Sequence, residues 1–186
     1  MFTNRPALKK DIPIHEIETQ HLNDEQEKHF YIIRDAVQQL LINNNDGNKE
    51  TSDVKKMIET CFSQVLEEKK ILFNKSTHDK LLEWVIADIV GYGPLEPLLN
   101  NPDITEIMVN GHDEVFVERF GLIEATTVRF ENDQHLRRVI DRIVSPIGRR
   151  VDETSPMVDA RLPNGYRVNA TIPPLSLDGP ILTIRK

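Results

Sequence analysis

Residues 157–172 are MVDARLPNGYRVNATI, two runs of alternating side chains joined by Pro-Asn-Gly at 163–165. Alternation with a period of two is typical of β-strands with one buried face, and Asn-Gly is favoured where a tight turn requires a positive φ. The stretch therefore predicts a β-hairpin. Arg161 and Arg167 stand on either side of its turn, and paired strands bring such positions within roughly 5–8 Å when they share a face.

Further strand patterns lie on both sides of this hairpin in the sequence. They cover residues 104–110, 114–119, 122–130 and 181–185, after a short helical turn at 95–99. One amphipathic helix precedes the hairpin; Asn132 or Asp133 caps it, and Pro146 and Gly148 end it. Residues 91–186 are therefore predicted to form a PAS-like α+β domain, with a mostly antiparallel sheet and one main covering helix.

The first half of the chain has helical rather than strand periodicity. Residues 1–22 show no sustained pattern and are expected to be a flexible arm. Three amphipathic segments follow, covering Asn23–Asn43, Ser52–Lys70 and a stretch from Ser76 to Gly91. Ser76 and Asp79 resemble a capping box, and Gly91 supplies a C-terminal stop. Short links between amphipathic helices favour mutual burial, so residues 23–90 are predicted to be a three-helix bundle.

The overall composition limits the function. The chain has 186 residues, a formal net charge of −7 and 28% charged residues, which is typical of a globular protein and argues against general nucleic-acid binding. Its single cysteine, Cys61, cannot form an intrachain disulfide and is expected to be a buried thiol in a reducing compartment. With neither a signal peptide nor a long apolar run, the expected location is cytoplasmic, without membrane insertion.

No motif in the sequence indicates a self-contained active site. The chain lacks the phosphate-binding pattern GxxxxGK[ST] as well as GxGxxG, HExxH and CxxC, and its six histidines are scattered. No metal site and no catalytic residue are therefore predicted in this stretch. A small-molecule enzyme of another kind would need a constellation of residues that the sequence does not contain.

Arginine and lysine are unevenly distributed. Ten of the 12 arginines follow residue 90, whereas 10 of the 11 lysines precede it. The arginines nearest the C-terminus are Arg149, Arg150, Arg161, Arg167 and Arg185. Guanidinium is planar, permanently charged and forked, so it suits phosphate or carboxylate. Two interpretations remain open: salt bridges with Asp152, Glu153 or Asp159, or presentation to an anionic ligand or a partner subunit.

Several tracts together resemble one known family. They are GYGPLEPLL at 91–99, PDITEIMVNG at 102–111, VFVERFG at 115–121 and GRRVDETSPMVDARLPNGYRVNATIPP at 148–174. They look like the region that precedes the motor domain in CpaF-type ATPases, members of the type II/type IV secretion ATPase superfamily that serve Flp (tight-adherence) pilus assembly. The N-terminal helices resemble the three-helix bundle in front of that region. In the family a RecA-like motor domain with a phosphate-binding loop and a Mg²⁺ site follows; this sequence stops at Lys186.

The resemblance implies a role in ATP hydrolysis by a larger assembly. Family members are hexamers in which ATP lies between this region and the motor domain, and arginines of this region reach the γ-phosphate. Carried onto this sequence, those residues are Arg161 and Arg167, followed by Arg149, Arg150 and Arg185. Hydrolysis would then change this contact and move the two domains.

The same resemblance sets the expected cofactors and partners. ATP and Mg²⁺ would belong to the full-length protein, with neither bound tightly to this stretch, which is not expected to hydrolyse ATP alone. The partners would be its own motor domain, neighbouring subunits of a homo-hexamer and platform proteins of the inner membrane, on whose cytoplasmic side the protein would be peripheral. The alternative is a free-standing, sensor-like protein-interaction module with no nucleotide role.

Overall fold

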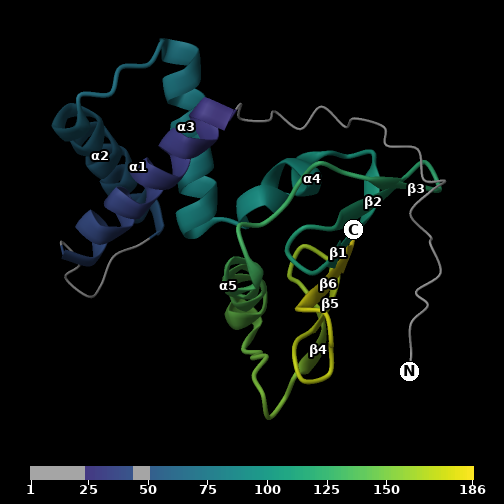
Figure 1. Ribbon diagram of the computed structural model, residues 1–186. Coiled ribbons are helices and arrows are strands. Elements are labelled where there is room, and N and C mark those ends of the chain that lie inside the picture. The colour runs from purple at the N-terminus through teal and green to yellow at the C-terminus, as the bar shows by residue number, and fades with distance from the viewer. Residues whose placement is uncertain (1–23, 44–50) are drawn as a thin grey trace, which may run out of the picture. The chain divides into compact units, whose positions relative to one another are not determined.

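The computed structural model describes residues 24–43 and 51–186 (Figure 1). The described residues form two compact units, and the chain passes from one to the other between Glu96 and Pro97. We call the first the helical unit and the second, residues 97–186, the sheet unit. The predicted flexible arm at 1–22 and the Asn-rich stretch that follows the first helix lie outside the described residues.

The helical unit follows the predicted helical segments to within one residue at most ends. Its elements are α1 (Asp24–Asn43), α2 (Thr51–Lys69), α3 (Lys75–Val90) and the 3₁₀ turn η2 (Gly93–Leu95). Helices α1, α2 and α3 share an apolar core that includes Ile33, Val37, Ile58, Phe62, Val65, Leu81 and Val85. These residues recur at three- and four-residue steps, so each helix buries one stripe.

The predicted start signal of α3 is wrong. Asn74, not Ser76, caps the helix: its side-chain oxygen accepts a hydrogen bond from the Thr77 backbone N–H at 2.9 Å. Asparagine is at least as good an N-cap as serine, and it stands two residues earlier. At the other end the Gly91 N–H donates to the Ala87 carbonyl, as expected of a C-cap.

The sheet unit, every residue of which is described, contains one six-stranded antiparallel sheet in the order β3-β2-β1-β6-β5-β4 (Figure 1). The strands are β1 (Ile104–Asn110), β2 (Val115–Arg119), β3 (Leu122–Ala125), β4 (Met157–Arg161), β5 (Arg167–Thr171) and β6 (Ile181–Arg185). The helical elements are α4 (Glu96–Asn100, beginning one residue before the unit), α5 (Asp133–Val144) and the 3₁₀ turn η3 (Ser145–Ile147). Two meanders of three strands each are thus joined through β1 and β6. The predicted α+β class is confirmed.

One predicted strand is too long. The pattern at 122–130 predicted a single strand, but β3 ends at Ala125. Beyond it the Phe130 backbone N–H donates to the His112 carbonyl at 2.7 Å, so the chain has left the edge of the sheet. Val128 and Phe130 are buried although they are not in a strand, which explains their apolar pattern.

The two faces of the sheet differ. One face carries buried apolar side chains, among them Ile107, Val117, Val168, Leu182 and Ile184, and α5 lies over this face with its own buried stripe (Figure 1). The other face, which we call the open face, contains no buried side chain on any of the six strands of the sheet unit. Side chains alternate between these faces along each strand, except at the start of β1, where the register shifts between Ile104 and Glu106.

Candidate arginine site on the open face

Three of the predicted arginines lie side by side on the open face. Arg161 is the cross-strand partner of Arg167, and Arg167 is the partner of Arg185. Neighbouring strands are about 4.8 Å apart, and directly paired residues point to the same face. The predicted pairing of Arg161 with Arg167 is confirmed, and β6 adds Arg185 to the same line. We call these three residues the arginine row.

The turn of the β4–β5 hairpin fixes the register of this row. The Leu162 N–H donates to the Tyr166 carbonyl at 2.7 Å, and the Gly165 N–H donates to the Leu162 carbonyl at 2.9 Å. Gly165 has φ +94°, a left-handed conformation that glycine adopts without steric cost. The Asn164 side-chain oxygen also accepts from the Tyr166 N–H at 3.1 Å. Asn164 and Gly165 thus each help to hold the two strands in alignment.

Arg167 has an internal partner. Its Nε and Nη2 donate to Oδ1 and Oδ2 of Asp159, at 3.0 and 2.7 Å. The hydrogen bond from Arg167 lowers the pKa of the Asp159 carboxyl, and the same bond raises the pKa of Arg167. Asp159 is thus one of the three acids considered in the sequence, and it neutralises the central member of the row. Both side chains are exposed, so the ion pair contributes little to stability.

Arg161 and Arg185 are in a different situation. Both are exposed, and neither side chain makes a hydrogen bond or an ion pair with any residue that the structure describes. Arg185 is the register partner of Glu106 as well as of Arg167, and Glu106 is in turn paired with Glu118. The line of side chains across the sheet is therefore positive on β4, β5 and β6 and negative on β1 and β2. Two guanidinium groups remain available for an external anion.

Arg149 and Arg150 are not part of the row. They follow η3, where Gly148 has φ +69° and the Arg149 N–H donates to the Val144 carbonyl at 3.2 Å. Arg150 lies 3.9 Å from Asp152 through its Nη2, and its side chain is 87% exposed. The structure therefore separates these two residues in the fold from the three arginines on the strands.

Lys186 is a residue that the sequence interpretation missed. Its Nζ donates to the carbonyls of Leu99 (3.0 Å) and Leu98 (3.5 Å), and also to that of Asn101. Burial lowers the pKa of this ammonium. One feature of the sequence could have drawn attention to Lys186: it is the one lysine of the chain after residue 90.

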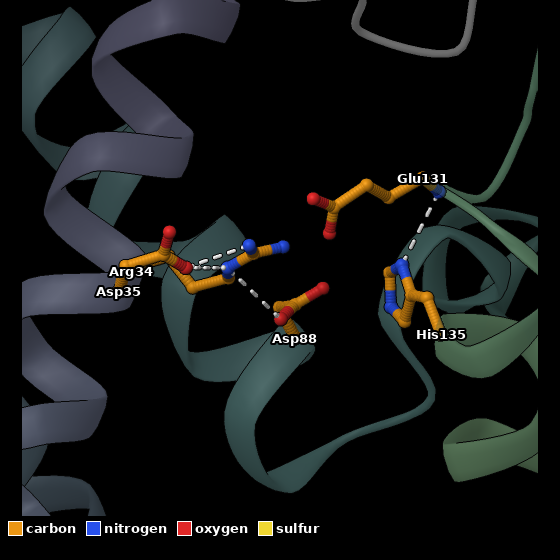
Figure 2. A network of polar contacts seen from close by, with 5 residues as sticks. All are labelled: Arg34, Asp35, Asp88, Glu131 and His135. Carbon is orange, nitrogen blue, oxygen red and sulfur yellow. Dashed lines mark hydrogen bonds and ion pairs between the residues drawn. The ribbon is translucent and has the colours of Figure 1, made fainter.

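Other polar contacts have a structural character. In the helical unit, Arg34 is 5% exposed and binds Asp35 at 2.6 Å, with Asp88 at 3.9 Å (Figure 2). In the sheet unit, the Glu131 backbone N–H donates to His135 Nδ1 at 3.4 Å (Figure 2). Over residues 24–43 and 51–186, no group of three or more His, Cys, Asp or Glu side chains is placed to hold a metal ion. None of the described helices has both the length and the apolar character that crossing a bilayer requires.

Two family models match the chain, one for each half. Residues 88–185 match the model described as type II/IV secretion system protein. Residues 30–90 match the N-terminal domain of type II secretion system protein E. The first match includes β1 to β6 and the whole arginine row.

Individual proteins match as well. The uncharacterized protein MJ0781 of Methanocaldococcus jannaschii is 37% identical over 111 residues, which are 58% of this chain and 15% of that protein. The putative conjugal transfer protein Rv3659c of Mycobacterium tuberculosis is 31% identical over 105 residues, 53% of this chain and 30% of that protein. The type IV secretion system protein VirB11 of Brucella suis is 35% identical over 94 residues, 50% of this chain and 26% of that protein.

A solved structure matches as well. The crystal structure of the VirB11 ATPase from Brucella suis, in complex with sulphate, aligns with a TM-score of 0.46 and 33% identity over 50% of this chain and 29% of that chain. The chain thus spans less than a third of the length of each of these relatives. Because the first family model covers more than half of its residues, this chain belongs to the type II/IV secretion system protein family.

Proposed function

We propose that this chain is the N-terminal region of a hexameric secretion ATPase of the CpaF type, and that its arginine row contacts ATP bound by the motor domain of the full-length protein. Membership of the secretion family supports this assignment, and so does the match of the chain to only 15–30% of the length of MJ0781, Rv3659c and VirB11. The observation that carries the proposal is the row itself: three guanidinium groups lie side by side on an open sheet face, and only the central one, Arg167, is bound by an acid, Asp159.

The chemistry fits a triphosphate. Charge develops on the γ-phosphate oxygens during phosphoryl transfer, and an arginine supplied from outside the nucleotide-binding domain stabilises that charge. The side chains of Arg161 and Arg185 form no ion pair with an acid among the described residues, although Glu106 is the cross-strand neighbour of Arg185. Arg167 keeps its position through Asp159 and still has donors to offer, because guanidinium carries five N–H groups. ATP and Mg²⁺ would be held by the motor domain, and this chain would supply positive charge.

In this proposal the row also transmits motion. Loss of the γ-phosphate removes the anion between the two domains, so hydrolysis and release allow a rigid-body rotation of the sheet unit relative to the motor domain. The helical unit would then contact platform proteins at the cytoplasmic side of the inner membrane. Flp pilus assembly is the process that we assign to the complex.

Steady-state ATPase assays of the full-length protein test the role of the row. We expect Arg161→Ala, Arg167→Ala and Arg185→Ala each to lower kcat by roughly 10²–10⁴-fold, the range for removing a group that stabilises the transition-state charge. Arg138→Ala is the matched control, because Arg138 is also exposed but lies on α5. Full activity in Arg161→Ala and Arg167→Ala would remove these residues from the mechanism.

A free-standing interaction module is the second candidate, and the bidentate pair between Arg167 and Asp159 favours it. An arginine that is held by a neighbouring carboxylate has a structural use without any nucleotide. The reading frame beyond codon 186 separates the two candidates. A GxxxxGK[ST] motif within roughly 50–100 residues supports the ATPase, and a stop codon directly after Lys186 supports the module.

A further inference from the structure

The C-terminal end of β6 is held by one ammonium group. Lys186 follows Arg185 directly, and its backbone N–H donates to the Thr105 carbonyl at 2.9 Å, which continues the pairing of β6 with β1. Its Nζ reaches the carbonyls of Leu98, Leu99 and Asn101. The last strand of the sheet unit is thus tied to α4, the helix that begins the unit.

These three acceptors are of a particular kind. The last carbonyls of a helix have no partner within the helix, and Leu98 and Leu99 belong to the last turn of α4. An ammonium group has three donors and no acceptor, so three carbonyls use its full hydrogen-bonding capacity. Lys186 makes no ion pair with an acid in the described part of the chain. Its role is therefore distinct from that of an ordinary surface salt bridge.

The alternation of side chains makes the position of Lys186 informative. Arg185 points to the open face with Arg167 and Glu106, so the next residue points to the opposite side of the sheet. Lys186 thus anchors the strand from the side opposite to the row, directly after the arginine that completes the row. If the backbone at residue 186 became mobile, the backbone of Arg185 would become mobile as well, because the two residues are adjacent in the chain.

We propose that Lys186 is a positioning residue for Arg185: by capping the carbonyls of Leu98, Leu99 and Asn101, it holds the end of β6 in register and keeps the Arg185 guanidinium in the arginine row. This inference rests on the proposed function of the row. It adds a residue that does not touch the nucleotide and acts through its neighbour. The carbonyls at the end of α4 are the acceptors in this contact.

The first test compares variants of the full-length ATPase. Lys186→Met keeps the length of the side chain and removes its donors, so we expect kcat to fall about tenfold while the KM for ATP changes less than about threefold. Lys186→Arg restores a permanent charge with several donors and should recover most of the loss. Lys55→Met is the control, because Lys55 is exposed on α2. A kcat within twofold of wild type in Lys186→Met overturns the proposal.

The pH profile gives a readout that a purely structural role does not move. Burial lowers the pKa of Lys186, so the ammonium loses its proton at a lower pH than an exposed lysine would. The arginine in Lys186→Arg stays charged throughout this range. We therefore expect the alkaline decline of kcat to begin at a higher pH in Lys186→Arg than in wild type. Identical alkaline limbs contradict the inference, and this comparison remains decisive if Lys186→Met does not fold.

Hydrogen exchange separates this inference from the proposed function. In the full-length protein, Lys186→Met should speed amide exchange at the end of β6, including the residue 186 N–H that donates to the Thr105 carbonyl, with unchanged exchange in β4. If Arg185→Ala has normal ATPase activity but the exchange result holds, the nucleotide role of Arg185 fails and the anchoring by Lys186 stands. If Arg185→Ala is inactive and exchange in Lys186→Met is unchanged, the inference fails and the function stands.

Discussion

The helical unit and the sheet unit use the same side chain in opposite ways. In the helical unit, Arg34 is 5% exposed and is held by Asp35 and by Asp88, which is itself 3% exposed. In the sheet unit, Arg161 and Arg185 are exposed, and their side chains make no hydrogen bond or ion pair with the described residues. Burial with acids makes an arginine part of the packing, whereas exposure on a regular strand without an acid leaves its donors for a ligand. Residue type alone does not distinguish the two uses.

Replacing one arginine from each unit with methionine gives the largest stability difference between them. Arg34→Met removes the ion pairs of a buried guanidinium with Asp35 and Asp88, and we expect it to lower the free energy of unfolding by about 2 kcal/mol. Arg161→Met removes no contact and should change it by less than about 0.5 kcal/mol. Urea denaturation followed by circular dichroism measures both. Equal losses would show that the two arginines are not used differently.

The N-caps of α3 and α5 allow one comparable substitution in each unit, with a smaller expected loss of stability. Asn74 caps α3 in the helical unit, and Asn132 caps α5 in the sheet unit by accepting from the His135 N–H at 2.9 Å. Asn74→Ala and Asn132→Ala should each cost about 1 kcal/mol, since each leaves one backbone donor of the first turn unsatisfied. Urea midpoints check the two values. A neutral Asn74→Ala would restore Ser76 as the effective cap.

The Asp159–Arg167 pair should give the smallest effect, and this effect should disappear at acid pH. A carboxyl whose pKa is lowered in the folded state stabilises that state above its unfolded pKa, and the contribution disappears as the pH falls through the folded pKa. Asp159→Asn should therefore be slightly less stable than wild type at pH 7, and the two should converge below roughly pH 4. Thermal melting at both pH values is the measurement. Glu153→Gln, at another exposed acid, is the control and should show no such convergence.

Local features of the fold were predictable from the sequence. The hairpin depends on Gly165 and on strict alternation in β4 and β5, and these features act over a few residues. The same holds for the stripe of α5 and for its cap at Asn132. The end of β3 was not predictable, because Val128 and Phe130 are buried without being in a strand, and burial produces the same apolar pattern in both cases.

The features that could not be predicted from the sequence depend on contacts between segments that are distant in the chain. The pairing of β1 with β6 places Arg185 in the row, and no local pattern determines which strand pairs with which. Lys186 binds Leu98 across 88 positions of sequence, so its role appears only when both segments are in place. The sequence interpretation named Arg149 and Arg185 together, after Arg161 and Arg167, although Arg185 lies in the row and Arg149 does not. Only strand register separates them.

The central pairing of β1 with β6 has a mechanical consequence. Because these strands are antiparallel, the beginning of β1 and the end of β6 lie at the same end of the ladder, where Glu106 faces Arg185. A force that pulled apart the chain segments before β1 and after β6 would break the hydrogen bonds between these strands one after another. Much less force is needed for this than for breaking all of them at once by sliding one strand along the other. The contact of Lys186 with the carbonyls of α4 stands ahead of the first rung. Such a force must therefore break the Lys186 contact before β1 and β6 begin to separate.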